Sequence, residues 1–135
     1  MKPVLIGLSL ITSLNILAQS KLSADDSLLI GTWKGTSICQ VKSSPCHDEI
    51  AVYHITKAEK PNTYRIVANK VVDGKEEDMG VLNYNFNATT KTLKCIDEDR
   101  SAIWTFHVDG SKMDGTLVYE NRVYRIIKLS KAGNK

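Results

Sequence analysis

The densest group of side chains that could do chemistry is the run Cys46-His47-Asp48-Glu49, with His54 a short distance beyond it. Thiolate, imidazole and carboxylate groups are the usual protein ligands of zinc. Along a strand, however, His47 and Glu49 share one face while Asp48 points to the other, so three ligands do not converge locally. Neither C-x-x-C nor H-E-x-x-H spacing occurs. The run therefore predicts a polar loop that enters a strand, and no metal site.

Other groups that could act in catalysis are scattered along the chain. Two acidic runs, Glu76-Glu77-Asp78 and Asp97-Glu98-Asp99, offer paired carboxylates of the kind used in glycoside hydrolysis. Both fall where strands are expected to end, and we interpret them as solvated surface. His107 is expected on the strand face opposite Trp104, as an outward polar residue, and no G-x-S-x-G frame surrounds a serine. The sequence therefore predicts no enzyme activity and no cofactor.

Aromatic side chains are the best remaining candidates for a site, because they are spread over many of the expected strands. Inside a small barrel they would either form a solid core, which is the usual role of buried aromatics, or line a ligand pocket. A binding role needs a pocket of about 300 Å³. The interior candidates for ligand contact are Tyr53, Tyr64, Tyr84, Phe86, Trp104, Phe106 and Tyr119.

The N-terminus has the three parts of a secretory signal peptide. Lys2 provides the positive charge, residues 4–17 are uncharged and mostly apolar, and Ala18 ends a region of small residues suited to cleavage. A transmembrane helix needs about 20 apolar residues, which is more than this run supplies. We therefore expect residues 1–18 to be removed and the protein to be secreted or periplasmic, and not embedded in a membrane.

Removal of 18 residues from the 135-residue chain leaves 117, enough for one domain with its own core. We divide it into an N-terminal lead, 19–30, and a β-barrel domain, 31–135. Loss of Lys2 leaves 17 basic side chains against 15 acidic ones. This near-neutral, interspersed balance is not typical of a nucleic-acid-binding surface, so nucleic acid is excluded as a partner.

The three cysteines are Cys39, Cys46 and Cys95. An oxidising compartment permits one disulfide and leaves one thiol. A Cys39–Cys46 bridge would close the polar loop 40–45, and we favour this pairing. Cys95 would then be a buried free thiol. The alternatives are a Cys39–Cys95 bridge and a Cys46–Cys95 bridge, which the sequence does not exclude.

Secondary structure is expected to be almost entirely β. The apolar residues 28–30 follow a polar lead with good N-cap residues, which predicts one helical turn. Beyond it, short runs with period two alternate with turn signals. Asp73-Gly74 and Asp109-Gly110 predict tight type I′ turns, and Gly115 predicts a bulge. The expected strands are 31–40, 47–58, 63–73, 76–87, 91–97, 101–108, 113–120 and 123–130.

Connections this short join antiparallel neighbours, so the strands form an up-and-down meander. Such a meander hides its apolar face either by closing into a barrel or by splitting into two packed sheets. The unbroken order of hairpins favours the closed barrel. The predicted fold is therefore all-β, an eight-stranded antiparallel meander barrel preceded by a short helical turn.

Gly31-Thr32-Trp33 opens the first expected strand, directly after the helical turn. A G-x-W at the start of an eight-stranded meander resembles the calycin superfamily, which includes lipocalins, fatty-acid-binding proteins and small bacterial lipocalin-like secreted proteins. The resemblance implies that Trp33 packs at the closed end of the barrel. It also implies that a basic side chain from the last strand lies over the indole as a cation–π pair, with Arg125 the first candidate and Lys128 the second.

The resemblance implies a secreted binding protein for a small, mostly apolar ligand. A protein–protein interaction module, such as an inhibitor of a secreted hydrolase, is the alternative, because small bacterial protease inhibitors of similar shape exist. In that case residues 21–29 or the Cys39–Cys46 loop would insert into the partner.

Overall fold

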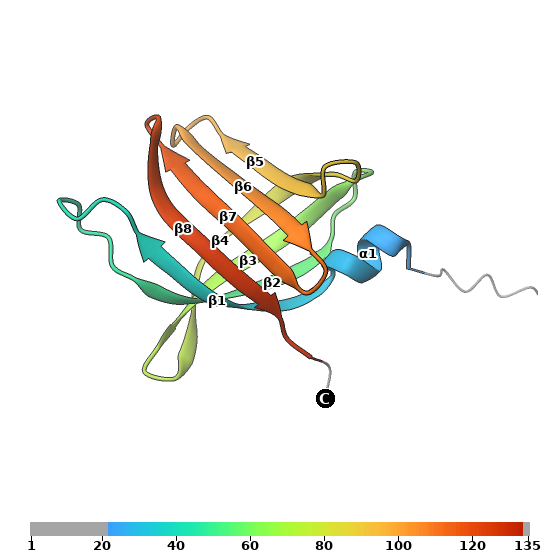
Figure 1. Cartoon of the computed structure of the whole chain (residues 1–135), viewed down its shortest axis with the longest axis horizontal. Coiled ribbons are helices and arrows are strands. Elements are labelled where there is room, and N and C mark those ends of the chain that lie inside the picture. The colour runs from blue at the N-terminus through green and yellow to red at the C-terminus, as the bar shows by residue number, and fades with distance from the viewer. Residues whose placement is uncertain (1–21, 134–135) are drawn as a thin grey trace, which may run out of the picture.

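A computed structural model describes residues 22–133 of the chain (Figure 1). The expected signal peptide, 1–18, lies outside the described residues. Within these residues the fold consists of one short helix and eight strands, and all the expected elements are confirmed to within about two residues. They are α1 (Ala24–Leu29), β1 (Gly31–Cys39), β2 (Glu49–Lys57), β3 (Thr63–Val72), β4 (Lys75–Asn87), β5 (Thr92–Asp97), β6 (Ala102–Asp109), β7 (Lys112–Tyr119) and β8 (Arg122–Lys131).

The strands form one closed barrel in sequence order, and β8 pairs back with β1. Every neighbouring pair is antiparallel, which confirms the predicted up-and-down meander. Closure brings the start of β1 beside the end of β8, so that Trp33 pairs with Lys131 and Cys39 pairs with Arg125. The first and last strands thereby shield each other's backbone edges from water and from other chains.

Helix α1 lies across one end of the barrel, which we call the closed end (Figure 1). Ser23 caps it, accepting a hydrogen bond from the backbone N–H of Asp26 at 3.0 Å. Leu29 is fully buried in the barrel core, and its carbonyl accepts the indole N–H of Trp33 at 2.9 Å. The helix thus supplies both an apolar plug and a polar partner for the buried tryptophan.

The basic side chain over Trp33 belongs to Lys131, so the predictions of Arg125 and Lys128 are wrong. The Lys131 ammonium lies 5.6 Å from the centre of the indole. It also donates to the carbonyls of Ser27 and Leu28, at 2.7 and 3.0 Å, and so ties the helix to the last strand. The register explains the error, because Arg125 is placed at the opposite end of β8 from Trp33.

Of the three glycine predictions, one is confirmed and two are wrong. Asp73 and Gly74 both have positive φ, at 51° and 76°, as the predicted type I′ turn requires. The last residue of β6, Asp109, instead pairs with Lys112, and only Gly110 has positive φ, which is typical of a type II′ turn. Gly115 forms no bulge; a Cβ there would overlap the ring of Phe106, so the glycine makes room for that ring.

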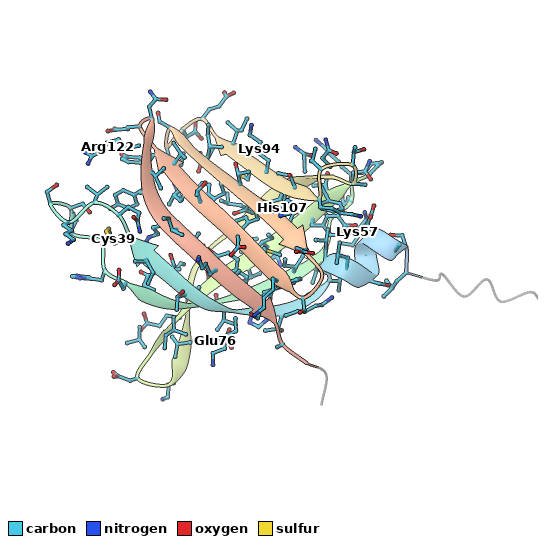
Figure 2. All side chains as sticks on the ribbon, in the orientation of Figure 1. Cys39, Lys57, Glu76, Lys94, His107 and Arg122 are labelled. Atoms are coloured by element: carbon cyan, nitrogen blue, oxygen red, sulfur yellow. A yellow bond between two sulfur atoms is a disulfide. The ribbon has the colours of Figure 1, made fainter. Side chains whose placement is uncertain are left out.

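The predicted disulfide between Cys39 and Cys46 is confirmed, and it lies at the end of the barrel away from α1 (Figure 2). Cys95 is a buried free thiol, as expected. Burial raises the pKa of this thiol, which keeps it protonated and unreactive.

We expect the Cys39→Ser/Cys46→Ser double variant to lose about 2–3 kcal/mol of free energy of unfolding, because the bridge restricts a short loop in the unfolded chain. Urea denaturation followed by circular dichroism measures this loss. Wild-type protein treated with a reductant should show the same loss. Equal stability of the reduced and oxidised wild-type protein would contradict the prediction.

A second polar contact fixes α1 on the barrel. Tyr64, which is buried, donates its hydroxyl to the Asp26 carboxylate at 2.6 Å, and the Lys57 ammonium lies 3.5 Å from the same carboxylate. The Tyr64 hydrogen bond is the largest cause of the lowered pKa of Asp26, and burial partly opposes it. Burial, followed by the contact with Asp26, raises the pKa of Tyr64.

This contact predicts a pH dependence of stability. A carboxyl group with a lower pKa in the folded state stabilises the fold above its unfolded pKa, and the contribution is lost as the pH falls through the folded value. We therefore expect Tyr64→Phe to be less stable than wild type at pH 7. The difference should shrink as the pH drops below about 4. Melting temperatures of both proteins across this range provide the measurement, and a difference that stays constant with pH would refute the assignment.

Candidate functional site

A cavity of about 240 Å³ opens into the barrel at the end opposite α1, which we call the open end. The disulfide loop and three tight connections, 73–74, 98–101 and 120–121, surround this end. Residues from seven of the eight strands line the cavity, so closure of the barrel is what creates it. Its volume is slightly below the lower end of the usual range for ligand pockets, about 300 Å³, so any occupant must be small.

The cavity wall is mostly apolar. Of the seven predicted aromatic candidates, Tyr53, Tyr84 and Trp104 line it. They are joined by aliphatic side chains from β3, β4, β7 and β8, namely Ile66, Leu82, Leu117 and Ile127, together with others. This composition suits the apolar part of a small organic molecule.

The other four aromatic candidates do not line the cavity. Phe106 is fully buried beneath it, with its ring 5.8 Å from that of Tyr53 and 5.9 Å from that of Tyr84. Tyr64 and Phe86 pack edge to face at 6.1 Å in the core. Tyr119 is 40% exposed and packs on Tyr124. The structure therefore divides the candidates into a cavity group, a core group and one surface residue.

A charged pair stands in the cavity wall, formed by Arg125 of β8 and Glu49 of β2. The two side chains are only 13% and 15% exposed, and a guanidinium nitrogen lies 3.4 Å from the carboxylate. Arg125 also donates to the backbone carbonyls of Ser37 and His47, at 3.3 and 2.9 Å, and to the Ser37 hydroxyl at 3.2 Å. Arg125 therefore joins β8 to β1 and β2 at the open end.

The environment of the cavity keeps its tyrosines neutral. Burial raises the pKa of Tyr53, the Glu49 carboxylate raises it further, and Arg125 partly opposes both effects. Burial is also the main cause of the raised pKa of Tyr84. Both residues line the cavity. A neutral tyrosine hydroxyl can donate and accept a hydrogen bond, so these two side chains can bond to a polar group of a ligand.

The predicted polar loop at Cys46 is confirmed. The Asp48 carboxylate accepts the backbone N–H of Cys39 at 2.9 Å, and Cys46 is in the disulfide. No group of three His, Cys, Asp or Glu side chains in the described part of the chain is arranged to hold a metal ion. His107 is exposed on β6, as expected, and the acidic run 76–78 is exposed (Figure 2).

A polar network on the outer wall was not predicted. The His54 ring lies 3.1 Å from the Thr32 hydroxyl through one nitrogen and 2.6 Å from the Glu76 carboxylate through the other. Asn69 donates to the same carboxylate at 3.1 Å, and these two contacts are the largest causes of the lowered pKa of Glu76. The network anchors the β3–β4 hairpin, which projects from the barrel wall (Figures 1 and 2). His54 was visible in the sequence, but its partners are not its sequence neighbours.

Comparison of the chain with protein-family models, with curated proteins and with solved structures finds no significant match.

Within residues 22–133, no helix is both long enough and apolar enough to cross a membrane.

Proposed function

We propose that this protein is an exported, lipocalin-like binding protein that holds one small, mostly apolar molecule with a single hydrogen-bonding group. The observation that carries the proposal is the cavity of about 240 Å³ at the open end, whose lining combines apolar side chains with Tyr53, Tyr84 and Arg125. Export is supported by the N-terminal pattern of the sequence and by the disulfide, because such bonds persist in oxidising compartments.

The position of the polar groups favours binding over a purely structural role. A barrel interior that served only as a core would be filled by apolar side chains, and buried hydroxyls would normally find partners within the protein. Here Tyr53, Tyr84 and Arg125 line the same open volume. The closed end, by contrast, is filled by Trp33, Leu29 and their neighbours.

The test uses an uncharged fluorescent dye with apolar rings and one N–H group, N-phenyl-1-naphthylamine, and octanol as the competitor. We expect the dye to bind one site per chain and to quench Trp104, and we expect octanol to displace it. Ala68→Trp adds bulk at the cavity wall and should abolish binding while the circular dichroism stays unchanged. Tyr119→Phe is the matched surface control and should bind like wild type. Undiminished dye binding by Ala68→Trp would overturn the proposal.

The disulfide loop supports the second candidate function, that of a protein–protein module such as an inhibitor of a secreted hydrolase. The bridge, the contact of Asp48 with Cys39, and a 2.8 Å hydrogen bond from Ser44 to the Val41 carbonyl together fix this loop at the open end. A loop held in one conformation loses little entropy when it binds. Replacement of residues 41–45 by a glycine–serine linker should abolish capture of a secreted hydrolase, and unchanged capture would exclude the loop.

A further inference from the structure

The barrel wall is weakest between β4 and β5. These strands pair only through Asn85–Lys94, Phe86–Leu93 and Asn87–Thr92. On its other side β4 pairs with β3 from Lys75 to Asn85, and all six residues of β5 pair with β6. The part of β4 before Asn85 and the part of β5 after Lys94 therefore face each other without a ladder between them.

The alternation of an antiparallel ladder shows which backbone groups face this gap. Phe86 donates its N–H to the Asn62 carbonyl on the β3 side, at 2.8 Å. Asn83 and Val81, at odd offsets from Phe86, therefore direct their N–H and C=O groups away from β3 and toward the gap. On β5, Cys95 pairs with Trp104 and directs its polar groups to β6, so its neighbour Ile96 directs them to the gap.

A surface groove of about 570 Å³ marks the same place. Its walls include Leu82 and Asn83 from β4 and Cys95 and Ile96 from β5. The Ile96 side chain is 59% exposed. Two facing strand edges with an apolar side chain between them form a template on which an extended chain can add its own hydrogen bonds.

The charge around the groove is acidic, whereas the whole chain carries a net charge of +3. The acidic run 97–99 supplies all the charged residues that line the groove. The Arg100 guanidinium lies 3.6 Å from the Asp97 carboxylate, but Glu98 and Asp99 form no salt bridge with any described residue. These carboxylates complement lysine and arginine side chains, and they oppose nucleic acid and anionic lipid.

We propose that an extended, basic segment of a partner protein adds as a strand in the gap between β4 and β5. Backbone groups of the segment pair with those of Val81, Asn83 and Ile96. Its basic side chains lie on the outer face beside Ile96 and bind the carboxylates of Glu98 and Asp99, whereas the alternate, apolar side chains point inward against Leu82. Val81 and Leu82 also line the cavity, but strand pairing needs no ligand there, so this proposal and the binding function can fail separately.

The test uses the full mature chain and three synthetic octapeptides. The first alternates lysine and valine, the second alternates glutamate and valine, and the third is the lysine peptide with every second amide N-methylated. We expect fluorescence anisotropy to show binding of the first peptide alone. Hydrogen exchange should slow at Val81, Asn83 and Ile96. Equal binding of the N-methylated peptide would overturn strand addition, and protection confined to the disulfide loop would place the peptide elsewhere.

Charge reversal provides the matched comparison. Glu98→Lys/Asp99→Lys should weaken lysine-peptide binding about tenfold or more, which corresponds to about 1.4 kcal/mol. Glu59→Lys/Asp109→Lys reverses two exposed charges at the closed end of the barrel and should bind like wild type. All four positions are exposed, so both variants are expected to fold. Equal binding by the two variants would overturn the proposed recognition of basic segments.

Discussion

Replacement of Trp33 by alanine is expected to lower the free energy of unfolding by about 3–5 kcal/mol, the usual cost of removing a fully buried tryptophan. Trp33 has no exposed surface, and its indole N–H is bonded to the Leu29 carbonyl. The substitution leaves a cavity at the closed end and removes the partner of that carbonyl. Because α1 is anchored through this contact, the helix should exchange its amide protons faster in the variant. Urea denaturation and hydrogen exchange provide the two measurements.

The neighbouring basic side chains supply the matched controls. Lys131→Met keeps the apolar stem over the indole but loses the two bonds to the helix carbonyls, so it should lower stability by about 1–2 kcal/mol. Lys128 is exposed on the same strand, and Lys128→Met should have no measurable effect. A loss below about 1 kcal/mol for Trp33→Ala would show that the closed end does not depend on the tryptophan.

The strand pattern was predictable because its causes are local. Alternation of apolar side chains, as at Leu82, Tyr84 and Phe86, repeats with the period of a strand, and Asp73-Gly74 demands the positive φ of a tight turn. The partner of Trp33 was not predictable in the same way. It depends on the register between the first and last strands, which closure of the whole barrel determines. A one-residue change of that register would bring a different side chain over the indole.

The residues that line the cavity were also not predictable from local patterns alone. Alternation indicates that an aromatic side chain points inward, but it does not give its height along the barrel axis. Tyr84 therefore lines the cavity, whereas Phe86, two residues along the same strand, packs in the core. The pair of Arg125 with Glu49 was missed because β2 and β8 are not adjacent in sequence or in the sheet. A basic residue at an inward position of the last strand was the only signal for it.

Removal of the guanidinium from this pair, by Arg125→Met, is expected to lower the free energy of unfolding by about 2–4 kcal/mol. The variant leaves the largely buried Glu49 carboxylate without its cation and leaves two backbone carbonyls without a donor. The double variant Glu49→Leu/Arg125→Met removes both charges and should recover the part of the loss that comes from the unpaired carboxylate. The two carbonyls still lack their donor, so we expect its stability to lie between those of Arg125→Met and wild type. A double-mutant cycle in urea measures the coupling, and additive losses would contradict it.

The pair should also control which polar group the cavity accepts. Glu49 neutralises Arg125 in the wild-type protein, so octanol should bind at least as tightly as octanoate. Glu49→Gln leaves the guanidinium uncompensated and should raise octanoate affinity about tenfold, whereas octanol affinity should change little. Arg125→Met should have the opposite effect on octanoate. Dye-displacement titrations with octanol and with octanoate measure the two affinities. If Glu49→Gln left the octanol-to-octanoate ratio unchanged, the charged pair would lie too far from the polar end of the ligand to select it.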